Sequence, residues 1–176
     1  NLYLATHLSD TFRPIETDDA QIYLLPYLDP MDVRIYFDLD DTGGCQTINQ
    51  AIKLVVDELK KTFKPNKKHI LVSHYYVVSS NNENYMFTSE TNSQVGGLQG
   101  VLASQFDAFD YVALGHIHGP QTVSRDTIRY CGSLLKYSFS EINHNKSITI
   151  ADIKGKHQDG GCDIEISTFP ARPLHN

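Results

Sequence analysis

Two short apolar runs in this 176-residue chain are each followed within two residues by histidine, which limits the folds that the chain can adopt. The run Tyr111–Leu114 predicts a buried strand, and His116 and His118 follow it one residue apart, after Gly115. Side chains at positions i and i+2 of an extended segment share a face, so these two imidazoles point the same way if the chain stays extended. Two neighbouring neutral imidazoles suit manganese, zinc or iron.

A third histidine follows the other apolar run. The segment His69–Ser73 predicts a strand that ends at His74. Functional residues of layered α/β proteins gather at the carboxyl ends of strands, and here two separate strands deliver histidine at that end. The alternative is structural, with two turn histidines and one rim histidine that bonds to backbone. The three histidines together favour a metal site over that alternative.

Length and composition are typical of a single globular domain. The chain is 40% apolar and 20% charged and is long enough to bury a core. No apolar run approaches the roughly 18 residues that cross a membrane, and the first residues lack a secretory signal. We therefore expect no membrane partner. The net charge of −6 argues against an autonomous nucleic-acid binder but leaves a phosphodiester substrate open, because bound cations dominate the local field.

The cysteines and the first residue lead to two further predictions, one on thiol state and one on the start of the chain. Cys45, Cys131 and Cys162 are odd in number and have no paired spacing, which predicts reduced thiols in a cytoplasmic protein and no structural zinc site. The chain starts on strand-like sequence without an initiator methionine, which suggests that a segment precedes Asn1.

Periodicity in the rest of the chain predicts helices and strands in one α/β domain. Apolar residues recur at helical spacing from Ile48 to Phe63, and Thr47 with Gln50 resembles a capping box, so this is the clearest helix. A long polar loop is expected between Tyr75 and Gly100. A short helix is expected at 98–106, and further strands are expected at 2–7 and 21–28. The later apolar runs predict an antiparallel meander, with strands at 121–124, 127–131, 147–153 and 163–168. The predicted class is α/β, a mixed β-sandwich flanked by helices, as a single domain over residues 1–176.

Six blocks of the sequence have an order and spacing that go beyond the histidine pattern. They are Ile70–His74, Ser89–Glu90, Gly96–Gly97, Phe109–His118, Ile128–Ser133, and Tyr137–Glu141 with Lys146–Ser147. Together they resemble SbcD, the nuclease subunit of the bacterial SbcCD complex, within the calcineurin-like metallophosphoesterase superfamily. The resemblance runs from about Tyr23 to Ile153.

The resemblance implies a two-metal site, usually occupied by manganese, whose ligands come in five blocks along the chain. His74 matches the fourth block, and His116 and His118 match the fifth. By the family pattern, His74 and His116 hold one metal and His118 holds the other. The first three blocks, Asp-x-His, Gly-Asp and Gly-Asn-His, have no match here, and no catalytic residue is matched.

The resemblance also implies a domain assignment and a function. The chain is expected to be the C-terminal portion of a metallophosphoesterase domain, with the N-terminal ligand blocks and a C-terminal capping domain outside it. The implied protein is a metal-dependent DNA exonuclease and endonuclease that acts in DNA repair, recombination and replication. Its implied partners are DNA, an SbcC-like ATPase subunit and a second copy of itself in a homodimer.

The 176-residue chain alone is expected to hold at most one metal weakly and to be inactive, because it supplies three neutral ligands and no matched carboxylate. Two alternatives remain: a metallophosphoesterase of another specificity, and a non-catalytic truncated module. Ser89 and Glu90 are candidates to approach DNA. Tyr75 and Tyr76 are expected to pack rather than to stack on bases. The segment Ser138–Glu141 is expected to order a loop by capping or salt bridging.

Overall fold

The computed structural model describes residues 2–40, 44–79, 100–156 and 162–171, and every structural statement below concerns those residues. Ser89, Glu90 and most of the predicted long loop lie outside them.

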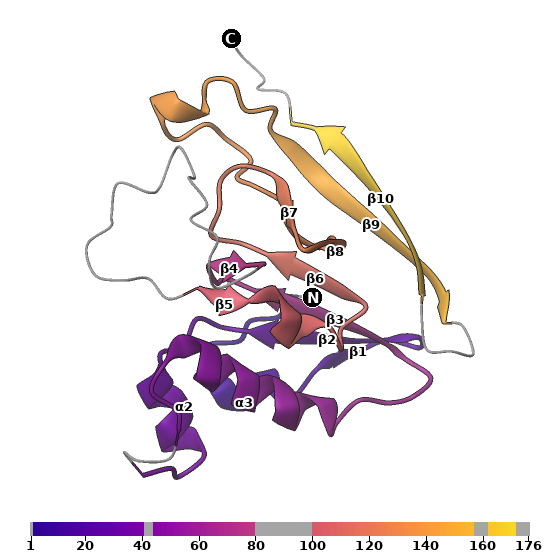
Figure 1. The fold of residues 1–176 in the computed structure, drawn as a ribbon. Helices are drawn as coiled ribbons and strands as arrows, with labels where there is room; N and C mark the ends of the chain where they lie inside the picture. Colours follow the sequence, from indigo (N-terminus) through magenta and orange to yellow (C-terminus); the bar gives the residue numbers. More distant parts are fainter. Residues whose placement is uncertain (1, 41–43, 80–99, 157–161, 172–176) are drawn as a thin grey trace.

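A six-stranded mixed sheet forms the centre of the fold, with strand order β1-β2-β3-β6-β8-β7 (Figure 1). Strands β2, β3, β6 and β8 run parallel to one another, and the outer strands β1 and β7 pair antiparallel with their neighbours. The bounds are β1 Ile15–Glu16, β2 Ala20–Leu25, β3 Lys68–Ser73, β6 Tyr111–Leu114, β7 Gln121–Val123 and β8 Arg125–Tyr130. One face of β2, β3 and β6 is buried, because helix covers that face of the sheet.

Helix α3 (Ile48–Lys60) provides most of that cover. Its five buried apolar side chains are at most 1% exposed. They form one hydrophobic cluster with the inward side chains of the central strands, including Tyr23, Leu71 and Val112. Thr47 begins the helix as the predicted capping box: its hydroxyl accepts from the Gln50 amide at 3.2 Å. In Figure 1, α2 (Pro30–Tyr36) and α3 lie below the sheet. No helix in the described ranges is long and apolar enough to cross a membrane.

A long antiparallel hairpin stands apart from the main sheet. Strands β9 (Ser147–Lys156) and β10 (Cys162–Pro170) pair only with each other and extend along the upper right of the molecule in Figure 1. Lys68 ties the hairpin to the start of β3, since its ammonium group donates to the Ile153 carbonyl at 2.6 Å. A third, very short sheet joins β4 (Val77–Val78) to β5 (Val101–Leu102) in parallel.

The predicted antiparallel meander is wrong in part. Strand β8 lies between β6 and β7, parallel to β6, so among the strands predicted for the meander only the β7–β8 and β9–β10 pairs are antiparallel. Apolar alternation identifies a strand but does not identify its neighbour, because both pairings use the same period of two. The mixed α/β class is confirmed, and the sandwich arrangement stays a prediction.

Three local predictions differ from the structure. Residues 2–6 are irregular and lead into the short helix α1 (Leu8–Thr11); they form no strand because no neighbouring strand pairs with them. The described part of the expected 98–106 helix is strand β5 followed by a 3₁₀ turn, η1 (Ala103–Phe106). Helix α2 was not predicted, although Asp29 caps it and Pro30 stands at its first turn, a recognisable start signal.

Candidate functional site

The two apolar runs that precede histidine are neighbouring parallel strands. Strand β3 pairs with β6, with Ser73 opposite Leu114, and the Gly115 amide donates to the Ser73 carbonyl at 2.9 Å. The carboxyl ends of both strands therefore meet at one edge of the sheet. His74 and His116 lie side by side there, with ring centroids 5.5 Å apart and planes at 83°. The expectation that both strands deliver histidine to one edge is confirmed.

Gly115 makes that approach possible. A Cβ atom at this position would lie 2.6 Å from His74 Nδ1, much closer than non-bonded atoms tolerate. The glycine therefore leaves the space that the His74 ring occupies. Since the His74 side chain is exposed, a larger residue at 115 would displace the ring and leave the strands in place.

The backbone turns sharply at His116, where φ is +91°. This left-handed value is uncommon for a residue with a Cβ and persists only where the surroundings enforce it. The two imidazoles were expected to point the same way only if this segment stayed extended. It does not, so His116 and His118 do not share a face. The His116 ring faces His74 and Tyr76, the latter at 6.4 Å between centroids, whereas the His118 ring lies 5.6 Å from Tyr137.

A buried carboxylate orients His118. Glu141, at the end of η2 (Phe139–Glu141), is 0% exposed, and its Oε1 lies 2.9 Å from His118 Nδ1. Its Oε2 accepts from Lys146 Nζ at 2.6 Å. Hydrogen bonds from Lys146 first and His118 second lower the pKa of Glu141 to about 2, so the carboxylate is ionised at neutral pH.

The segment Ser138–Glu141 orders its loop as predicted. The Ser138 hydroxyl caps η2 by accepting from the Ser140 amide at 3.3 Å, and Glu141 forms the ion pair with Lys146. The prediction did not connect this loop with His118. A spacing of 23 residues between His118 and Glu141 carries no periodic signal that could have found the contact.

Tyr75 belongs to the core, which confirms the expected packing. Its ring is 1% exposed, and its hydroxyl accepts from the Leu28 amide at 2.7 Å and donates to the Pro26 carbonyl at 3.1 Å. Tyr76 is half-buried beside His116. Cys45, Cys131 and Cys162 form no disulfides within the part of the chain that the structure describes.

The imidazoles fit part of a metal site. His74 and His116 form one close pair, and His118 has the carboxylate partner on its second nitrogen that is usual for a metal-bound imidazole. Within the described ranges, however, three or more His, Cys, Asp and Glu side chains do not group so as to hold a metal ion. The ligand roles of His74, His116 and His118 stay predictions.

Fold and site together define an α/β domain that presents histidines at the carboxyl ends of adjacent parallel strands. No family model matches the chain. It is 32% identical over 173 residues to the SbcD subunit of the nuclease SbcCD from Staphylococcus epidermidis, an alignment that covers 98% of this chain and 43% of that protein. The predicted resemblance to the SbcD nuclease subunit is thus confirmed. The chain spans less than half the length of this relative.

Proposed function

We propose that this chain supplies histidine ligands to a metal-dependent phosphodiesterase centre that cleaves DNA. The observation that carries the proposal is the close pair of His74 and His116 at the carboxyl edge of two parallel strands, in a chain similar to a nuclease subunit. Neutral imidazoles at such an edge are suited to bind manganese or zinc. Bound divalent cations would activate water and stabilise the leaving oxygen of a phosphodiester.

Different histidines of this chain would bind the two cations. His74 and His116 would hold one cation, and His118, oriented by Glu141, would contribute to a second, in line with a two-manganese site. Gly115 keeps the first pair close by leaving room for the His74 ring. The sandwich form of a calcineurin-like metallophosphoesterase domain, of which this chain is the C-terminal portion, is part of the same proposal.

The same proposal includes partners and setting. The relative is named as one subunit of the nuclease SbcCD, and we infer an SbcC-like ATPase subunit, a second copy of the protein and DNA as partners, in DNA repair, recombination and replication. A cytoplasmic location stays a prediction. For the 176-residue chain alone we expect at most one weakly held cation and no nuclease activity, because the described residues do not bring three or more His, Cys, Asp and Glu side chains together so as to hold a metal ion.

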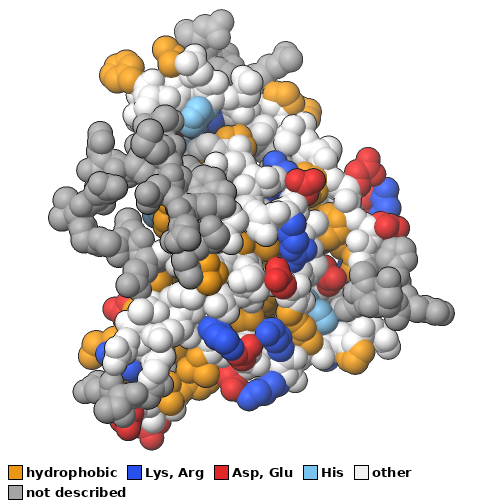
Figure 2. Space-filling view, viewed as in Figure 1, with side chains coloured by type: hydrophobic (Ala, Val, Ile, Leu, Met, Phe, Trp, Pro, Cys, Tyr) orange, Lys and Arg blue, Asp and Glu red, His pale blue; other side chains and the backbone are white. Residues whose placement is uncertain are grey.

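Charges on the surface of helix α3 are balanced. Among the residues coloured in Figure 2, acidic and basic side chains are interspersed over α3. Lys53 and Lys60 both pair with Asp57, at 2.5 and 2.9 Å, so their charges are locally balanced. The acidic balance also keeps a metallophosphoesterase of another specificity as a second candidate.

Calorimetric titration of the metal-free chain with Mn²⁺ and with Zn²⁺ tests the proposal. We expect one weak site that is lost in His74→Ala and in His116→Ala, because each variant removes one imidazole of the pair. His7→Ala is the matched control, since that side chain is 81% exposed and lies at the start of α1. Binding that survives both site variants would contradict the assignment.

A cleavage assay with the same proteins, using DNA and a small phosphodiester, extends the test. We expect neither substrate to be cleaved by the chain alone. Manganese-dependent cleavage that disappears in His116→Ala would overturn the expected inactivity of the chain, and a preference for the small phosphodiester would favour the second candidate.

A further inference from the structure

A buried ion pair lies inside an otherwise exposed loop. Residues 134–140 are all exposed, yet Glu141 is 0% exposed and the Lys146 side chain is 4% exposed. Burying two charges costs desolvation, and apolar residues of similar volume often give equal or greater stability in their place. A contribution to stability therefore does not explain why Glu141 and Lys146 are buried together. A need to hold side chains of this loop in a fixed geometry does explain it.

Both oxygens of the Glu141 carboxylate have directed partners. Oε1 lies 2.9 Å from His118 Nδ1, and Oε2 accepts from Lys146 Nζ at 2.6 Å and from the Tyr137 amide at 3.3 Å. An ionised carboxylate has only acceptor atoms, so the hydrogen of this contact belongs to Nδ1. In the neutral ring, Nε2 then carries the lone pair and is the nitrogen able to bind a metal.

Lys146 holds the backbone of the same histidine. Its ammonium group donates to Glu141 Oε2, to Ser133 Oγ at 2.7 Å and to the His118 carbonyl at 3.0 Å, which uses all three of its hydrogens. The Ser133 amide donates to that carbonyl as well, at 3.1 Å. His118 is therefore fixed at two points, at its carbonyl directly and at its ring through Glu141.

We propose that Glu141 and Lys146 are positioning residues that fix the ring of His118 with hydrogen on Nδ1 and leave Nε2 as its metal-binding nitrogen. The claim that a metal binds Nε2 rests on the proposed function, whereas the position of the hydrogen on Nδ1 does not. Side-chain partners of this kind typically change metal affinity about 10–100-fold when they are removed. The loop 133–146 thereby acts as the support of one ligand.

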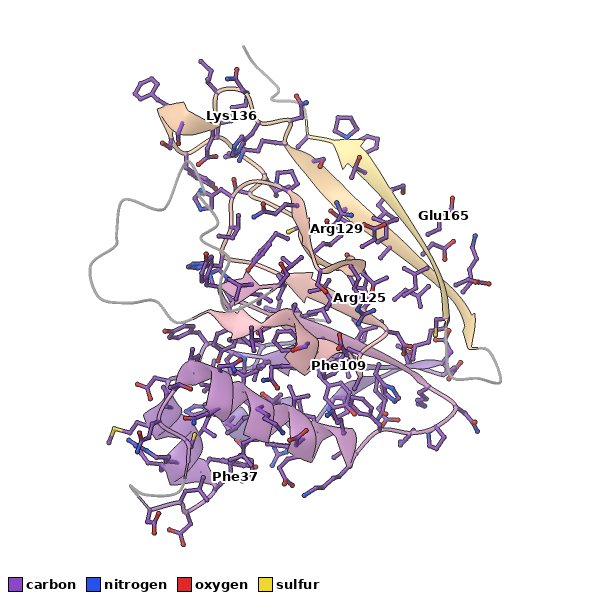
Figure 3. All side chains as sticks on the ribbon, viewed as in Figure 1. Phe37, Phe109, Arg125, Arg129, Lys136 and Glu165 are labelled. Carbon is purple, nitrogen blue, oxygen red and sulfur yellow. The ribbon has the colours of Figure 1, made fainter. Side chains whose placement is uncertain are left out.

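The test compares two paired replacements. Glu141→Leu with Lys146→Met removes both buried charges together, so neither is left unpaired and the chain is expected to fold. Lys154→Met with Glu165→Leu removes an exposed pair on the hairpin, 2.9 Å long, as the matched control. Figure 3 shows Glu165 on the outer side of the hairpin, well separated from Lys136 in the loop of η2.

Long-range ¹H–¹⁵N spectra of the imidazoles, recorded on the metal-free chain in alkaline buffer, report the tautomer directly. Wild type and the hairpin variant are expected to carry hydrogen on Nδ1 of His118, and the loop variant is expected to lose this preference while it still unfolds cooperatively. The weak Zn²⁺ site of the chain, which rests on His74 and His116, should be unchanged in the loop variant.

The outcomes separate this inference from the proposed function. Hydrogen on Nε2 of His118 in wild type, or an unchanged tautomer in the loop variant, would overturn the positioning role. A fixed Nδ1 tautomer in wild type that is lost in the loop variant supports it, even if wild type binds no Zn²⁺. A wild type that binds no Zn²⁺ would contradict the proposed metal site but not the positioning role of Glu141 and Lys146.

Discussion

Replacing Lys146 alone with methionine is expected to lower the melting temperature of the chain by roughly 6–20 °C. The single replacement leaves the buried Glu141 carboxylate without its ammonium partner, and an uncompensated buried charge is far more harmful than the loss of both charges. Thermal unfolding followed by circular dichroism at neutral pH measures the shift. Lys154→Met, which breaks an exposed pair, should change the melting temperature by no more than about 4 °C.

The same variant has a defined pH dependence. The folded-state pKa of Glu141 is depressed from 4.5 to about 2, so the stability contributed by the ion pair is present above pH 4.5 and is lost as pH falls towards 2. The difference in melting temperature between wild type and Lys146→Met should therefore shrink over that interval. A constant difference across it would show that Lys146 stabilises the loop through packing rather than through the charge of Glu141.

Combining Lys146→Met with Glu141→Leu should recover most of the lost stability, because no charge is then left buried. A double variant as unstable as the single one would mean that the loop needs these two residues for its fold. The spectra proposed for His118 are informative in the recovered double variant, where the loop is folded and only the hydrogen-bond partner is missing.

Local periodicity was sufficient to predict the elements that position the first histidine pair. The apolar runs before His74 and Gly115 form β3 and β6, and the stripe from Ile48 onward forms α3 with its Thr47 cap. The prediction succeeded because these signals lie within single elements. That the two strands are parallel neighbours was not predicted and is a finding of the structure.

The surroundings of His118 could not be predicted in this way. Its direction depends on the left-handed backbone at His116, which a His-Ile-His pattern does not specify. Its partner Glu141 comes from a loop 23 residues further on, and that contact depends on the path of β7 and β8 between them. Contacts between residues far apart in the sequence are set by tertiary structure. The periodicity and motif spacing of one sequence therefore cannot predict them.

Replacing Gly115 with alanine is expected to weaken binding at the His74–His116 pair at least about 10-fold while leaving the fold intact. The new Cβ would lie 2.6 Å from His74 Nδ1, so the imidazole has to shift from its present position beside His116. The ring is exposed and moves at little cost, so the free energy of unfolding should change by less than about 1 kcal/mol. Calorimetric titration with Zn²⁺ and urea denaturation measure the two quantities.

Gly155→Ala on β9 is the matched control, because a Cβ there meets no atom within 4 Å. Its Zn²⁺ affinity should equal that of wild type. Unchanged affinity in Gly115→Ala would show that the two imidazoles do not act as one binding pair, whatever their separation in the fold. Loss of affinity with a large loss of stability would instead assign Gly115 to the β3–β6 pairing. Only loss of affinity at constant stability supports a glycine that makes room for a ligand, since that combination follows from displacing one exposed ring.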